Sequence, residues 1–359
     1  MNMAAPLADH DGKAGRIYLE AGHRVVAETV RARIFYEGDP EKREAVDVKA
    51  DDFDGVSFYV SVSPEEKNLM RVALQVPCFK AIKDAVGEGY FAELFGLFAC
   101  CSLEAPMPGF GLTVLVNLDA LPASESEKED LVSKLSTLKR EVVGAPLWVC
   151  FRALLTGSKP PRSYYVVPYR PAETMYVVPS DDLVVVVYTV SFDDHVERAI
   201  ANSFLQEIVI SRRQSPHLAS APTVNFSQEP PHELKTIPGL TIRQPSRDKC
   251  VGAPAETPPD KVPEKFVGYL SLAISKRIVE SGRLEKAVTL TEGYRSFLMY
   301  HVQATKSQLH ARIRRRAANW LQVLNRAMPE KLNVEKKTIK GRTFNRAGAA
   351  VVAATRLGS

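Results

Sequence analysis

The chain has 359 residues, 45% hydrophobic and 25% charged, with a net charge of +5, a composition typical of a globular protein with room for two domains. Its five cysteines, an odd number without CxxC spacing, argue against a disulfide framework and indicate free thiols in a reducing compartment. No apolar run reaches the roughly 18 to 20 residues that cross a bilayer, and residues 1–15 lack the apolar centre of a signal peptide. We therefore expect a cytoplasmic protein.

The first half of the chain alternates between helical and strand-like patterns. Residues 1–15 are small and polar, and we expect a disordered extension there. The Asp54-Gly55 pair suits a turn or bulge. Apolar spacing predicts helices at 16–33 and 79–98 and strands at 53–62, 70–76 and 111–118.

A further helix is expected to link the two halves. Ser124 followed by Glu127 has the spacing of a capping box, in which the two side chains satisfy backbone amides at a helix start. The spacing therefore predicts a linking helix over 125–155.

The second half repeats this order of patterns with different residues. Acidic Asp193 and Asp194 favour the amino end of a helix that continues to about Arg213. Residues 229–264 hold eight of the 24 prolines, which indicates a loop, with a Pro-rich insert at 236–264. Strands rich in Val and Tyr are predicted at 163–169, 174–178 and 183–192, and short strands at 223–227 and 265–275.

Helix, strands, helix, strands thus occurs twice along the chain. This order predicts an α+β protein with two related domains, each an antiparallel sheet with packed helices, over 16–124 and 125–280.

A long helix is predicted over 281–328, ending before Pro329, which has no amide proton and restricts the residue before it. Its apolar positions recur on average every 3.6 residues, so one stripe persists along one side. The stripe consists of Leu298, Val302, Thr305, Leu309, Ile313, Ala317, Trp320, Leu324 and Ala327.

Such a helix is too long for the domain that it follows. Its 48 residues would span about 70 Å, whereas a domain of about 140 residues is only about 35 to 40 Å across. An apolar stripe that extends beyond the domain would be an exposed patch too large for a monomer, so we expect a partner to cover it. The alternative is that the stripe folds back onto its own chain.

Positive charge is concentrated at the same end of the chain. Residues 281–359 hold sixteen Lys or Arg against four Glu, so the remaining residues are net acidic. The predicted basic tail, 329–359, contains five cations in eleven residues, namely Lys336, Lys337, Lys340, Arg342 and Arg346. A local basic surface indicates docking on an acidic partner such as nucleic acid, anionic lipid or an acidic protein lattice, although a solvated face would also explain a run such as Arg314-Arg315-Arg316.

No catalytic or metal-binding pattern is present in the sequence. Walker, GxSxG and HExxH spacings are absent, and His301 and His310 point to different sides of the last helix. Asp51-Asp52 and Asp181-Asp182 are interpreted as solvated turns. Five tyrosines of the second domain are interpreted as packing residues and not as a base-stacking platform: Tyr164, Tyr165, Tyr169, Tyr176 and Tyr188.

Several blocks match a known family in order and spacing. They are Asp52-Phe53-Asp54-Gly55-Val56, Leu121-Pro122-Ala123-Ser124, Glu173-Thr174-Met175-Tyr176-Val177, Phe204-Leu205-Gln206-Glu207, Arg212-Arg213, Glu229-Pro230-Pro231, Glu233-Leu234-Lys235, Tyr300-His301-Val302, Val323-Leu324-Asn325-Arg326-Ala327, and Lys337-Thr338-Ile339-Lys340-Gly341-Arg342-Thr343-Phe344. Over about 16–346 the chain resembles subunit 2 of the actin-related protein 2/3 complex, the seven-subunit assembly that nucleates branched actin filaments.

The resemblance implies a function for the apolar stripe of the long helix and for the basic surface. In that family the long helix packs against the long helix of subunit 4, and the pair forms the core of the complex and lies along the side of the mother actin filament. It implies a non-catalytic scaffold in the cytoplasm and cytoskeleton, at the actin-rich cortex and in cell projections, without cofactor, metal, nucleic acid or membrane. The partner-helix residues would be Leu298, Val302, Leu309, Ile313, Ala317, Trp320, Leu324 and Ala327.

The filament-binding residues are expected on the basic tail, with Arg212 and Arg213 as further candidates. Three segments depart from the family: residues 1–15, an insert around 240–264, and a tail at 347–359. The alternative function is a nucleic-acid-binding module that uses the arginine-rich helix to follow phosphates. Against it, Arg314 points away from Arg312 and Arg316, and no RNA-recognition signature is present.

Overall fold

The computed structural model describes residues 21–238, 240, 242, 265–280 and 282–327. It separates into two compact units, Met1–Ala304 and Thr305–Ser359, which are described one at a time. The predictions for residues 1–15, most of the Pro-rich insert and the basic tail lie outside the described residues.

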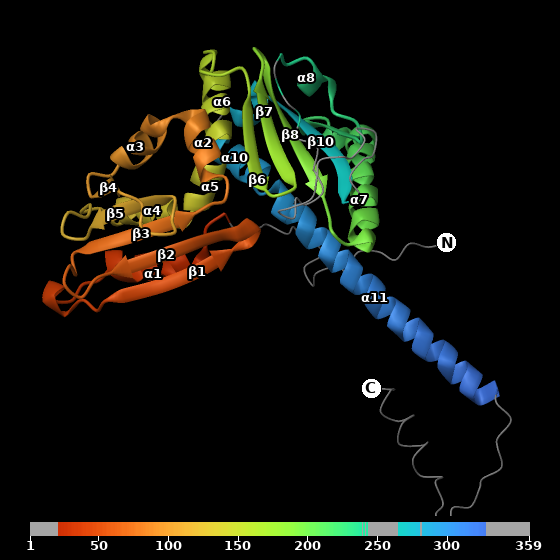
Figure 1. The fold of residues 1–359 in the computed structure, drawn as a ribbon, viewed down its shortest axis with the longest axis horizontal. Helices are drawn as coiled ribbons and strands as arrows, with labels where there is room; N and C mark the ends of the chain where they lie inside the picture. The colour runs from red at the N-terminus through yellow and green to blue at the C-terminus, as the bar shows by residue number, and fades with distance from the viewer. Residues whose placement is uncertain (1–20, 239, 241, 243–264, 281, 328–359) are drawn as a thin grey trace, which may run out of the picture. The chain divides into compact units, whose positions relative to one another are not determined.

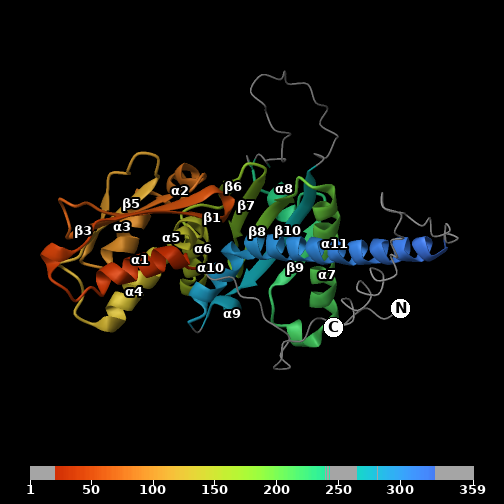
Figure 2. The ribbon, with the colours of Figure 1, turned by 90° about the horizontal axis from the view of Figure 1, so that it is seen from below.

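The first sheet has five antiparallel strands in the spatial order β1-β2-β3-β5-β4 (Figure 1). Every second residue of β2 is buried, so one face of the sheet lies on the core, where α1 (Arg24–Ile34) packs. Figure 2 shows α1 lying beside α4 (Glu125–Ser136). The strands are β1 (Val46–Asp52), β2 (Val56–Val62), β3 (Leu69–Gln75), β4 (Cys101–Glu104) and β5 (Leu112–Asn117).

The second sheet has the order β6-β7-β8-β10-β9. Its central strands are buried on both faces, because Tyr188 faces the main core whereas Tyr176 faces a smaller cluster with Leu234 of α8 (His232–Lys235). Helix α7 (His195–Gln214) packs on β9 and β10. The strands are β6 (Tyr165–Arg170), β7 (Glu173–Pro179), β8 (Leu183–Ser191), β9 (Thr223–Ser227) and β10 (Phe266–Ser275).

The two sheets therefore share one topology, in which the fourth strand in sequence lies at the edge beyond the fifth. The fold is α+β, with two five-stranded antiparallel sheets, packed helices and a long final helix, as predicted. The sequence showed the order helix, strands, helix, strands twice, and in the structure the order of the strands within each sheet is also repeated. We retain the domain boundaries 16–124 and 125–280 as a proposal.

The linking segment is three helices, and the prediction of a single helix over 125–155 is wrong. They are α4 (Glu125–Ser136), α5 (Leu138–Val143) and α6 (Ala145–Thr156). The chain turns at Gly144, where a Cβ atom would lie 2.5 Å from the Arg140 carbonyl oxygen and 2.9 Å from Val288, so no side chain fits. The capping box is also wrong, because Ser124 is the N-cap residue but its side chain makes no capping hydrogen bond.

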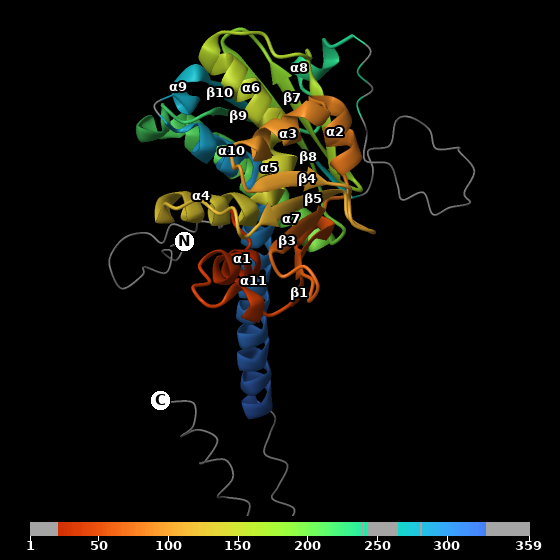
Figure 3. The same cartoon turned by 90° about the vertical axis from the view of Figure 1, so that its left-hand side faces the viewer.

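The predicted helix over 281–328 is also interrupted. Helix α10 (Leu284–Glu292) ends at Gly293, and α11 (Tyr294–Ala327) follows, while α9 (Lys276–Val279) precedes them. Helix α11 keeps 34 residues, which corresponds to about 50 Å. The interruption lets α10 pack on α5 and α6, where the two sheets meet (Figures 1 and 3).

Smaller differences from the predictions have local causes. Helix α1 begins at Arg24, and the helix predicted at 79–98 is two helices, α2 (Phe79–Val86) and α3 (Glu88–Gly96), separated by Gly87. Gly87 has a φ of 88°, a left-handed conformation that favours glycine. Strands β1 and β4 were not predicted.

The two aspartate pairs differ in their surroundings. Asp51-Asp52 ends strand β1 and is not a solvated turn, because Asp52 forms an ion pair of 3.0 Å with Lys139. Asp181-Asp182 is an exposed bend before β8, as predicted, and Asp54-Gly55 makes the expected turn between β1 and β2.

Candidate partner-binding surface on the last helix

Helix α11 begins inside the core of the first unit. Leu298 and Val302 are fully buried in the main hydrophobic cluster. His301 packs against Phe204 and Phe297, with ring centroids 5.5 and 4.3 Å away, and burial lowers the pKa of its imidazole. The first two turns of α11 are therefore anchored by the chain itself.

A buried ion pair strengthens this anchor. Arg295 Nε donates to both carboxylate oxygens of Glu173 on β7, at 2.9 and 2.7 Å, and both side chains are almost fully buried. Glu173 also accepts from the Ser191 amide at 2.7 Å, and the Arg295 guanidinium lies 4.4 Å from the Phe192 ring centroid. Arg295 Nη2 donates to the Ser191 carbonyl oxygen at 3.0 Å, whereas Arg295 Nη1 is buried without a hydrogen-bond partner among the described residues, so the carboxylate is fully paired and the guanidinium only in part.

The second unit contains the other part of α11, and its described side chains are almost all exposed. Every residue from Ser307 to Arg326 is exposed. The large apolar side chains of the stripe have exposed fractions of 43% for Leu309, 54% for Ile313, 63% for Trp320 and 41% for Leu324. A helix of five turns thus presents one apolar side to solvent, a feature that marks a binding surface.

The predicted partner-helix residues divide into two groups. Leu309, Ile313, Ala317, Trp320 and Leu324 are exposed, whereas Leu298 and Val302 have no surface left for a partner. Leu298 and Val302 pack on their own chain, which is the alternative that the sequence analysis gave for the stripe. Ala327 is the last residue of α11. Val323, 60% exposed, was not predicted, although it lies three residues from Trp320 on the same side.

The predicted filament-binding residues are only partly described. Arg212 Nε donates to the carbonyl oxygens of Ala221 and Pro222, at 3.2 and 3.1 Å, and its Nη2 donates to Ala219 at 3.0 Å. Arg212 therefore ties the end of α7 to the segment before β9. Arg213 is exposed, and the five tail cations lie outside the described residues.

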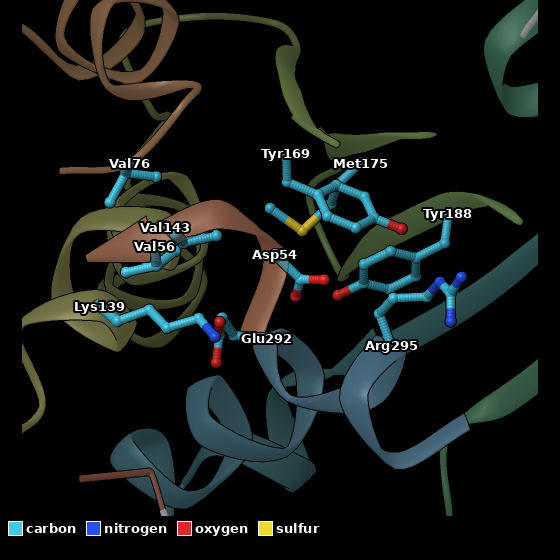
Figure 4. Close-up of a pocket in the computed structure, with 10 residues that line it drawn as sticks. All are labelled: Asp54, Val56, Val76, Lys139, Val143, Tyr169, Met175, Tyr188, Glu292 and Arg295. Carbon is cyan, nitrogen blue, oxygen red and sulfur yellow. The ribbon is translucent and has the colours of Figure 1, made fainter. Parts of the chain in front are cut away.

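A small cavity lies where the two sheets meet α10 and α11 (Figure 4). Its volume is about 20 Å³, enough for about one water molecule and too small for a cofactor. Figure 4 shows Lys139 and Glu292 pointing toward one another at one end, while Asp54 and Tyr188 line the other. Burial raises the pKa of Glu292 to about 7, opposed by Lys139 and aided by Asp54 and Asp52.

The Glu292 carboxyl makes stability depend on pH. Its folded pKa lies above its unfolded value, so the folded chain holds an extra proton between about pH 4.5 and 7, and stability should fall as pH rises through that range. Glu292→Gln should therefore stabilise the chain above pH 7, by at most about 3 kcal/mol, and little at pH 4.5. Urea unfolding monitored by pulse proteolysis of the purified complex checks this. Glu65→Gln, at an exposed position, is the control, and equal effects of the two variants at every pH would contradict the assignment.

Other chemistry is not evident in the part of the chain that the structure describes. No cluster of three His, Cys, Asp or Glu side chains there could hold a metal ion, and no helix there has the length and apolar content to cross a membrane. Four cysteines are free thiols as expected, and burial raises the pKa of Cys78 and Cys150 to about 12. Tyr165, Tyr169, Tyr176 and Tyr188 are buried in the core, which confirms their packing role.

An anchored helix with one exposed apolar side, on a fold without a catalytic constellation among the described residues, defines a structural subunit of a larger assembly. The family model described as "Arp2/3 complex, 34 kD subunit p34-Arc" matches residues 72–331, and the chain belongs to that family. It is a non-catalytic structural subunit of the actin nucleation complex, associated with the actin cytoskeleton, and the other Arp2/3 complex subunits are its partners.

Two curated relatives cover nearly the whole chain. The "Actin-related protein 2/3 complex subunit 2" of Schizosaccharomyces pombe is 29% identical over 324 residues, 86% of this chain and 93% of the relative. The protein of the same name from Dictyostelium discoideum is 29% identical over 330 residues, 91% of this chain and 99% of the relative.

Proposed function

We propose that this subunit pairs, through the exposed part of α11, with the long helix of subunit 4, and that the pair binds the side of the mother actin filament. One observation carries the proposal: Leu309, Ile313, Trp320 and Leu324 lie on one side of a helix with about half of each side chain exposed. Full burial of such a side chain contributes roughly 1.5 to 3 kcal/mol, so covering the exposed half of all four contributes on the order of 3 to 6 kcal/mol. The proposed location is the actin-rich cortex and cell projections.

Co-expression tests the helix pairing directly. The chain should be poorly soluble or self-associated when produced alone, and monodisperse when produced with subunit 4, because only the partner covers the apolar side. Light scattering after size-exclusion chromatography gives the mass of each species. A stable, monodisperse monomer without subunit 4 would contradict the pairing, and nucleic acid co-purifying with a steep salt dependence would support the alternative module.

Filament binding is proposed for the basic tail, with Arg213 as a further candidate and Arg212 weaker because its guanidinium is used within the chain. Exposed cations contribute only about 0.2 to 1 kcal/mol per pair, so several must act together. Changing Lys336, Lys337, Lys340 and Arg342 to Gln should weaken filament co-sedimentation and branching several-fold and flatten their salt dependence, while complex assembly is unchanged.

The matched control removes the same charge elsewhere. Lys49, Lys80, Lys159 and Lys276 are exposed cations of the first unit, and changing all four to Gln should leave filament binding close to that of the unaltered complex. Equal effects of the two quadruple variants would place the binding surface outside the tail.

A further inference from the structure

The exposed part of α11 carries its positive charge unevenly around the helix. At roughly 100° per residue, with Leu309 as the reference, Ile313, Trp320 and Leu324 lie within about 60° on one side. In the other rotational direction from Leu309, Arg316 lies at about 20°, Arg312 at about 60°, and Arg326 and Arg315 at about 100° and 120°. Arg314 lies at about 140° in the same direction as Ile313, Trp320 and Leu324, nearly across the helix from Leu309. The apolar stripe is therefore bordered along one edge by a row of four arginines: Arg312, Arg315, Arg316 and Arg326.

These arginines have no acidic neighbour on their own helix. Helix α11 contains no Asp or Glu, and Arg312, Arg315 and Arg316 have no acidic residue three or four positions away in the sequence. All four are exposed, and among the described residues none of them forms an ion pair. A surface helix of a free monomer ordinarily mixes both signs of charge, whereas this one lacks acids along its whole length.

Arg316 lies so close to the stripe that it must be enclosed when the stripe is covered. Only about 20° separates it from Leu309 around the helix, and it follows Ile313 by three residues and precedes Trp320 by four. A guanidinium that loses its water needs other acceptors, and a carboxylate is the strongest of them, because it neutralises the charge and can accept two parallel hydrogen bonds. We therefore expect the partner to supply both apolar side chains and carboxylates.

We infer that the occupant of this surface is an amphipathic helix with a row of carboxylates along one edge of its apolar face, placed to meet Arg312, Arg315, Arg316 and Arg326. This inference rests on the proposed helix pairing and adds the chemistry of the partner. The one-sided row also selects the direction and rotation of the partner helix, because a helix docked the other way round would place its acids against uncharged residues on the opposite edge.

Single charge reversals in the complex reconstituted by co-expression of its subunits test the inference. Arg316→Glu and Arg312→Glu should each lower recovery of the chain with a tagged partner subunit at least tenfold. Arg314→Glu is the matched control, with the same change of charge and side chain on the same helix, and recovery should change less than twofold. The NaCl concentration that dissociates half of the complex is the second measurement.

Replacing the charge with a similar apolar volume separates ion pairing from packing. Arg316→Met leaves a partner carboxylate unpaired, so it should lower recovery at least threefold and reduce the salt dependence. If Arg316→Met assembled as well as the unaltered chain, or if reversals at Arg312 and Arg316 matched Arg314→Glu, the acidic row would be absent.

Trp320→Asp and the arginine reversals together distinguish a failure of the inferred acidic row from a failure of the proposed helix pairing. If Trp320→Asp abolishes assembly while Arg312→Glu and Arg316→Glu lower recovery no more than Arg314→Glu does, the helix pairing stands and only the acidic row is overturned. Trp320→Asp that leaves assembly intact overturns both. Equal losses at all the arginines, Arg314 included, with nucleic acid bound to the purified chain, would point to a phosphate backbone and also overturn the acidic row.

Discussion

Replacing Trp320 and Leu324 together with aspartate is expected to release the chain from its complex. Both side chains are about half exposed on the stripe of α11, and covering the exposed part contributes on the order of 1.5 to 3 kcal/mol together. Aspartates at the same positions would be buried without a partner charge, which adds to the cost. Association with the other subunits should weaken at least a hundredfold, measured by co-purification over a range of concentrations.

The control for this variant places the same charges on the opposite side of the helix. Ala318 and Asn325 are exposed and lie roughly 160° to 180° from Leu309, so changing both to aspartate should leave assembly nearly unchanged. Equal losses from the two double variants would mean that added negative charge, and not loss of the apolar side, weakens association.

The second large effect is expected at the anchor of α11. Arg295→Ala leaves the Glu173 carboxylate buried against β8 without its main partner and should destabilise the fold by about 3 to 5 kcal/mol. Because α11 begins at this ion pair, loss of the anchor should also reduce recovery of the complex. Pulse proteolysis in urea measures the change in the free energy of unfolding.

A double variant distinguishes the ion pair from simple loss of packing. Arg295→Met combined with Glu173→Gln removes both charges and should be less destabilising than Arg295→Ala alone, since no unpaired charge remains. If the double variant were more destabilising than Arg295→Ala, the cost would come from volume and hydrogen bonding and not from the buried carboxylate.

Strand prediction from the sequence succeeded where burial follows the local pattern. In β2 every second residue is apolar and buried, and in β9 Val224 and Phe226 alternate with polar residues, and both strands were predicted. Strand β1 carries Lys49, Asp51 and Asp52, and β4 has only four residues, most of them exposed. These two are strands because β2 and β5 offer them a hydrogen-bonding edge, and no local property of their residues reveals that edge.

The helix boundaries were wrong for a related reason. Helical periodicity continues through Gly144 and Gly293, so a single long helix was the natural prediction at each place. At Gly144, where α5 gives way to α6, a Cβ atom would lie 2.9 Å from Val288 of α10, so only a glycine fits there. Whether a glycine in a periodic pattern is tolerated or becomes a turn depends on the element that packs against it.

Spacing and composition are properties of neighbours in the chain, and they determined what can be read locally: the α+β class, the apolar stripe through Leu309, Ile313, Trp320 and Leu324, and the absence of acids beside its arginines. Only the tertiary structure decided that Leu298 and Val302 belong to the chain's own core and that Arg295 meets Glu173, 122 residues earlier. Burial and ion pairing depend on which distant segments are brought together. The free energy of such contacts is spread over the whole core, so no single segment of the sequence contains it.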